Sequence, residues 1–146
     1  MMREIAEALQ HLHEQDITHG DLKMLNVLRV DNKSKLIDFD ASASIGPIDS
    51  FIGAKFSSGN LSPELFHKLK NQTEIDEYNT YFEKISSDPN EADLWLKVMP
   101  VVCGKKGTFV VKTFLPPDKV GGNGKLPYDL IPASRGGDIW AFGVML

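Results

Sequence analysis

Two short acidic stretches near the start of the chain decide how the rest of the sequence is interpreted. The first is His19-Gly20-Asp21-Leu22-Lys23-Met24-Leu25-Asn26, and the second is Ile37-Asp38-Phe39-Asp40. Between them they supply two carboxylates, an ammonium group and a carboxamide, on Asp21, Asp38, Lys23 and Asn26. These polar groups come from two turns that a short connection separates. We therefore expect them to act together in one site.

This set of groups suits phosphoryl transfer, a reaction in which the protein does little covalent work. A base must orient a hydroxyl, a cation must offset charge on the phosphoryl oxygens, and oxygen ligands must hold Mg²⁺. Asp21 fits the first task and Lys23 the second. Asn26 and Asp38 fit the third.

The two stretches resemble sequence motifs of the protein kinases. Residues 19–26 are similar to the catalytic loop H-R-D-L-x-x-x-N, and residues 38–40 are similar to D-F-G. Ser62-Pro63-Glu64 resembles A-P-E, and residues 138–143 resemble the D-x-W-x-x-G opening of the helix beneath the active site. The four motifs occur in family order, which makes the resemblance specific.

The resemblance implies an α+β, protein-kinase-like fold. Residues 1–146 would be a partial kinase domain, a truncated and mainly α-helical C-lobe with a small β-hairpin and a long insert at residues 71–134. The chain begins about one helix before the catalytic loop and leaves no room for an N-lobe with its Gly-rich phosphate loop. We therefore expect the isolated fragment to be inactive.

The resemblance also implies a function, ATP-dependent phosphoryl transfer to serine or threonine hydroxyls of a protein substrate. Asp21 and Lys23 would be the catalytic residues, while Asn26 and Asp38 would hold Mg²⁺ and, through it, ATP. A catalytically inactive kinase-fold binding or scaffold protein is the alternative.

Two substitutions depart from the family pattern. Gly20 replaces an arginine that usually pairs with a phosphorylated activation loop, so we expect no strong dependence on loop phosphorylation. Asp40 replaces a glycine. It would either restrict the movement of the loop or supply another oxygen that faces the metal.

The activation segment, residues 41–61, offers only serine hydroxyls, at Ser42, Ser44, Ser50, Ser57 and Ser58. Most are ordinary loop residues. Ser57 stands where serine/threonine kinases usually carry a threonine that contacts the catalytic aspartate and lysine, and Lys23 is typical of the same kinases.

Helical periodicity predicts an amphipathic helix over Arg3–Gln15. His11 and His13, with His19 and Asp21, invite a metal-dependent hydrolase interpretation. On a helix, however, positions 11 and 13 point about 200° apart, which disfavours it. We expect His19 to pack under the loop and bond to the backbone.

The β-prone runs 27–30 and 35–37, separated by turn formers at 31–34, predict a hairpin with Asn26 and Asp38 at its two ends.

Ser62-Pro63-Glu64 also reads as a helix start. Residues 139–146 are almost wholly apolar and predict a buried helix. The resemblance to kinases implies that Asp138 accepts backbone N–H bonds from the catalytic loop. The alternative is that Asp138 only caps that helix.

In the insert, we expect helices over Glu74–Ile85 and Glu91–Met99 and a strand over Thr108–Leu115. The insert could restrict substrates or dock a partner protein. A packed elaboration without a role is equally consistent with its sequence.

Composition excludes some classes. A net charge of −4 argues against nucleic-acid binding, and no apolar run is long enough to span a membrane. The single cysteine, Cys103, excludes an internal disulfide. We expect a cytoplasmic protein.

Overall fold

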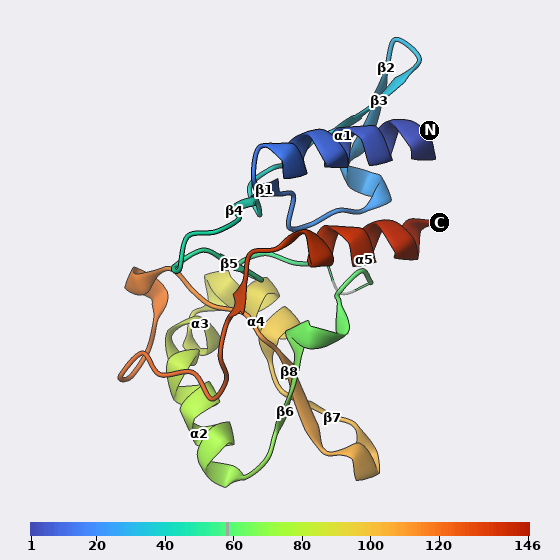
Figure 1. Cartoon of the computed structure of the whole chain (residues 1–146). Helices are drawn as coiled ribbons and strands as arrows, with labels where there is room; N and C mark the ends of the chain where they lie inside the picture. The colour runs from blue at the N-terminus through green and yellow to red at the C-terminus, as the bar shows by residue number, and fades with distance from the viewer. Residues whose placement is uncertain (58) are drawn as a thin grey trace. The chain divides into compact units, whose positions relative to one another are not determined.

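The computed structural model describes residues 1–57 and 59–146 and divides the chain into two compact units. The first comprises Met1–Pro63 and Ile131–Leu146, and the second comprises Glu64–Leu130. Both contain helices and strands, so the expected α+β composition is confirmed (Figure 1). Ser58, one of the predicted activation-segment serines, lies outside the described residues.

The first unit is built from two longer helices and short strands that pair in twos. Its helices are α1 (Met2–Glu14), the 3₁₀ turn η1 (Met24–Asn26) and α5 (Arg135–Met145). Its strands pair antiparallel as β1 (Ile17–Thr18) with β4 (Ala43–Ser44), β2 (Val27–Val30) with β3 (Lys33–Leu36), and β5 (Phe51–Ile52) with β9 (Ile131–Pro132).

The helix predicted at the N-terminus is confirmed as α1. Its apolar residues Ile5 and Leu9 are buried and form a core with Leu22 and Ala141. Leu22 lies in the first acidic stretch and Ala141 in α5. Burial of these apolar side chains therefore ties the acidic stretch to α1 and α5.

The predicted hairpin is present, but its turn is shorter than expected. Asp31 and Asn32 both have positive φ angles, 48° and 62°, and β3 already begins at Lys33. Two consecutive residues of positive φ form a type I′ turn, which matches the twist of the two strands. Asp and Asn tolerate this conformation better than most residues, so two residues suffice.

Helix α5 differs from its prediction in its start and in its burial. It begins at Arg135 after Ser134, so Asp138 lies in its first turn and not before it. The sequence did not indicate this start, because the helix begins with Gly136 and Gly137 in its first turn and glycine is a poor helix former. The helix is also not buried all round: Ile139 is 61% exposed.

Among the described residues, no helix is both long and apolar enough to cross a bilayer.

The helix start predicted at Ser62-Pro63-Glu64 yields a single 3₁₀ turn, η2 (Pro63–Leu65), after which the chain continues as strand β6 (Phe66–Leu69). Ser62 is buried, and its hydroxyl forms no hydrogen bond with any described residue. Its hydroxyl therefore does not cap the turn through any described residue.

The second unit contains more structure than the two helices and one strand predicted for it. Strand β6 pairs with β8 (Thr108–Val111), which also pairs with β7 (Val101–Val102), and all neighbours are antiparallel (Figure 1). The helices are α2 (Gln72–Tyr81), α3 (Glu83–Ser87) and α4 (Ala92–Val98), with 3₁₀ turns η3 (Pro89–Glu91), η4 (Gly104–Lys106) and η5 (Pro117–Lys119). The predicted helix over 74–85 is interrupted at Phe82.

Aromatic side chains form the core of the second unit. Tyr78 and Phe82 are fully buried, with ring centroids 4.6 Å apart, and Tyr128 packs against Tyr78. The Tyr78 hydroxyl donates to the carbonyl of Val98, and the Tyr128 hydroxyl donates to that of Thr113. Burial raises the pKa of both phenols well above the usual value for tyrosine.

These raised pKa values predict that the second unit loses stability in alkaline solution. Above about pH 10 the two tyrosines ionise in the unfolded chain but stay protonated in the folded one, so the free energy of unfolding falls as pH rises. Urea unfolding at neutral and at alkaline pH, followed by Trp95 fluorescence in a Trp140→Phe background, measures the loss. Tyr78→Phe should make the loss smaller. An unchanged alkaline loss in that variant would contradict the prediction.

Candidate active site

Asp138 anchors the first acidic stretch. Its carboxylate, only 2% exposed, accepts hydrogen bonds from the backbone N–H groups of His19 at 2.8 Å and Gly20 at 3.0 Å. The predicted bonds to this stretch are confirmed. The capping alternative is wrong, because the residue before the first turn of α5 is Ser134. His13 Nε2 lies 2.9 Å from the same carboxylate, a contact that the sequence did not indicate.

His19 has the structural position expected for it. It is fully buried, its Nε2 bonds to the carbonyl of Ile37 at 3.1 Å, and its ring lies 5.1 Å from that of Phe39. The backbone N–H of Asp21 donates to its Nδ1. Since Nδ1 accepts, Nε2 carries the proton and donates to Ile37. One imidazole thus joins the two acidic stretches.

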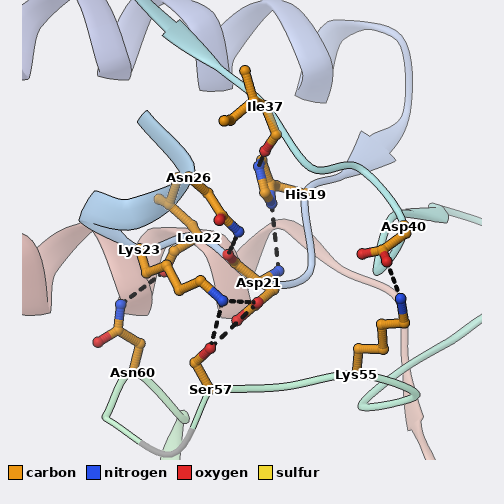
Figure 2. Close-up of polar contacts among 10 residues, drawn as sticks. All are labelled: His19, Asp21, Leu22, Lys23, Asn26, Ile37, Asp40, Lys55, Ser57 and Asn60. Atoms are coloured by element: carbon orange, nitrogen blue, oxygen red, sulfur yellow. Dashed lines mark hydrogen bonds and ion pairs between the residues drawn. The ribbon is translucent and has the colours of Figure 1, made fainter. Parts of the chain in front are cut away.

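Asp21, Lys23 and Ser57 form a closed triangle of hydrogen bonds (Figure 2). The Lys23 ammonium donates to Asp21 Oδ2 at 2.6 Å and to Ser57 Oγ at 2.8 Å, and Ser57 Oγ donates to Asp21 Oδ2 at 3.3 Å. The contact predicted for Ser57 is therefore confirmed. No described residue donates to the other carboxylate oxygen, Oδ1, so Asp21 keeps an acceptor for a further hydroxyl.

Asn26 is buried and held close to Asp21, because its amide donates to the Asp21 carbonyl at 2.9 Å. The backbone N–H of Ile37 donates to the carbonyl of Asn26 at 3.0 Å, next to the pairing of β2 with β3. The two ends of the hairpin therefore meet as expected, and Asp38 follows directly.

Asp38 is exposed and has a positive φ of 65°, a strained conformation that is enriched at functional sites. Its carboxylate pairs with no described residue. The amide oxygen of Asn26 and the carboxylate of Asp38 are hard oxygen donors of the kind that Mg²⁺ prefers, so the donor chemistry fits that ion.

Gly20 cannot carry a side chain in this backbone. Its φ is +81°, and a Cβ atom built on it would lie 2.1 Å from the carbonyl oxygen of Ala41. The departure from the family pattern at this position is thus enforced by close contact between two backbone segments.

Asp40 pairs with Lys55, and both side chains are more than half exposed (Figure 2). Of the two roles expected for Asp40, this contact agrees with restraint of the loop, since it joins residue 40 to the following segment.

Lys55 was not recognised from the sequence. Neither was Asn60, whose amide donates to the Leu22 carbonyl at 2.8 Å. Both partners are distant in sequence, and no local pattern marks them.

The histidine-rich metal cluster is not formed. His13 bonds to Asp138 and His19 to Ile37. Within residues 1–57 and 59–146, no group of three or more His, Cys, Asp or Glu side chains could hold a metal ion.

Comparison with known proteins agrees with the motifs. A family model described as "Protein kinase domain" matches residues 1–80, more than half of the chain. The chain belongs to the protein kinase family. No solved structure matches it significantly.

Several curated kinases are similar to parts of the chain. Serine/threonine-protein kinase PSK1 of Saccharomyces cerevisiae is 40% identical over 57 residues, which is 36% of this chain and 4% of that protein. Nik-related protein kinase of Mus musculus is 39% identical over 70 residues, 44% of this chain and 5% of that protein. Hormonally up-regulated neu tumor-associated kinase of Homo sapiens is 37% identical over 79 residues, 51% of this chain and 11% of that protein. The matched stretches thus span a small fraction of these relatives.

The close contact at Gly20 predicts a large destabilisation for Gly20→Ala. The new methyl group would meet the Ala41 carbonyl and also force a non-glycine residue into positive φ, which together should lower the free energy of unfolding by about 3 kcal/mol or more. Chemical denaturation measures this loss.

Gly46→Ala is the matched control, because Gly46 also has a positive φ of 111° but no atom lies within 4 Å of a built Cβ. It should cost only the backbone strain, about 1–2 kcal/mol. Equal losses for the two variants would show that the contact with Ala41 is unimportant.

Proposed function

We propose that this chain contributes the catalytic loop and the metal-binding turn of a serine/threonine protein kinase. The arrangement of Asp21 carries the proposal: Lys23 and Ser57 hold one carboxylate oxygen, and the other is open to a substrate hydroxyl. A base for phosphoryl transfer must be fixed in direction and still have a free acceptor. Asp21 meets both conditions.

In this proposal Asp21 orients the substrate hydroxyl and accepts its proton. Lys23, whose ammonium lies 2.6 Å from Asp21, offsets the negative charge that the transferred phosphoryl group brings. Ser57 holds the Lys23 ammonium and the Asp21 carboxylate in position relative to each other, because it bonds to both. Membership of the kinase family supports a transferase, and transfer to a protein hydroxyl is the finer step proposed here.

Asn26 and Asp38 would hold Mg²⁺, and with it ATP. The ion would neutralise phosphate charge and orient the transferred group when bound. The bond from Ile37 to Asn26 keeps the two side chains in adjacent parts of the hairpin. The carboxylate of Asp38 pairs with no described residue, so its oxygens are available.

Transfer to serine or threonine is supported by Lys23 and Ser57, which occupy positions typical of kinases with that specificity. The relatives in yeast include proteins named serine/threonine-protein kinases. We further propose that residues 1–146 are part of a C-lobe and that residues 71–134 are an insert in it. Most of that insert falls in the second compact unit.

A kinase-fold binding or scaffold protein without turnover is the second candidate. The departures from the family pattern at Gly20 and Asp40 favour it. The complete triangle at Asp21 favours the enzyme.

Asp21→Asn should abolish phosphoryl transfer by the natural protein that contains this chain, assayed with ATP, Mg²⁺ and a general protein substrate. The amide cannot accept a proton, so the rate should fall by about a thousandfold. With the unsubstituted protein, phosphoamino-acid analysis of the substrate should find phosphoserine or phosphothreonine. Asp93→Asn, on the surface of α4, is the control and should leave the rate unchanged.

The scaffold alternative gives the opposite result. The unmodified protein would then transfer no phosphate, and Asp21→Asn would leave partner binding as it was.

Ser57→Ala should have a smaller effect than the change at Asp21. It removes two hydrogen bonds that position Lys23 and Asp21 but leaves both charged groups, so a loss of about tenfold in kcat is expected. Ser57→Thr keeps the hydroxyl and should restore most of the rate. If Ser57→Ala lowered the rate as much as Asp21→Asn does, Ser57 would have a role beyond positioning.

A further inference from the structure

The sheet of the second unit has an unusual outer face. Antiparallel pairing places Phe66 opposite Val111 and Phe109 opposite Val101, and all four share one face because 109 and 111 are two residues apart on β8. On the opposite face, Leu69 and Val110 are buried in the core.

One face of a sheet at a protein surface is normally polar. Here Phe66 is 47% and Val101 54% exposed. The outward face therefore presents exposed apolar side chains next to Lys68, which lies opposite Phe109 on the same face. Exposed apolar patches with a polar rim mark binding surfaces.

This face borders a groove of about 360 Å³ that also includes Met99, Cys103 and two lysines, Lys97 and Lys106. A groove of this size accepts one or two large apolar side chains. Its lining residues, all within the described part of the chain, include no carboxylate.

The charges at the groove are uncompensated. Neither Lys97 nor Lys106 forms an ion pair with a described residue, although the chain as a whole carries a net charge of −4. Elsewhere in this unit, Lys119 pairs with Glu91 and Lys125 with Glu77. The groove therefore combines an apolar floor with two positive charges that no described residue neutralises by an ion pair.

We propose that this groove, lined by Phe66, Lys97, Met99, Val101, Lys106 and Phe109, docks an acidic peptide segment of a partner protein. The peptide places one or two large apolar side chains in the groove, and its flanking carboxylates pair with Lys97 and Lys106. Apolar burial supplies the affinity, and the charges select the partner. The surface lies in the second unit and does not require the proposed catalytic residues.

The test uses the whole 146-residue chain and three pools of short fluorescein-labelled peptides. One pool has Leu and Phe at fixed positions among random Asp and Glu. The second has the same Leu and Phe among Lys and Arg, and the third has Asp and Glu with Ser in place of the apolar residues. Fluorescence polarisation measures binding.

The first pool should bind at least about tenfold more tightly than either of the others. Lys97→Glu combined with Lys106→Glu should weaken its binding by about tenfold and reverse the preference toward the basic pool. Phe66→Ser should weaken both apolar pools equally.

Lys33→Glu combined with Lys35→Glu is the matched control, because it changes the net charge equally on strand β3 of the first unit. It should leave binding unchanged, and circular dichroism should show that every variant is folded. The proposal is overturned if no pool binds, if the acidic and basic apolar pools bind alike, or if the control pair weakens binding as much as the groove pair does.

Discussion

The bonds that Asp138 accepts from the backbone of His19 and Gly20 are the constraint on which the first unit depends. A carboxylate removed from water is stable only when its oxygens are well satisfied, and here two backbone N–H groups and an imidazole satisfy them. Among the described residues, these backbone N–H groups have no other acceptor. The carboxylate and the two backbone N–H groups therefore satisfy one another, and helix α5 fixes where the first acidic stretch begins.

From that anchor the arrangement of the site follows step by step. Fixing residues 19 and 20 places the His19 ring under Ile37, which joins the stretch to the end of the hairpin. The hairpin then brings residue 37 to Asn26, and Asp38 comes next. Backbone bonds and one buried imidazole thus position the two acidic stretches, and the side-chain contacts among Asp21, Lys23 and Ser57 then orient the groups that the proposed chemistry needs.

Local patterns predicted the parts of this unit that depend on local rules. The periodicity of α1 and the turn formers between β2 and β3 were read correctly, apart from the length of the turn. The resemblance to kinase motifs implied that Ser57 meets Asp21 and Lys23 and that Asp138 meets the stretch at residues 19 and 20. The partners Lys55, Asn60 and His13 were missed, because long-range pairs leave no periodic signal in one sequence.

The second unit was predicted less well, for a physical reason. Strand β7 has only two residues, and β6 carries His67 and Lys68 between apolar neighbours, so neither shows clear alternation. Their pairing with β8 is decided by tertiary packing. The exposed apolar face of that sheet could be found only once the pairing was known.

The pair of Asp40 and Lys55 has a consequence for how the segment between them responds to its surroundings. Both groups face water, so dissolved ions screen their attraction and the loop is held less firmly as salt concentration rises. A pair this exposed contributes little free energy, so it restrains the segment only weakly, and that restraint is weakest at high ionic strength.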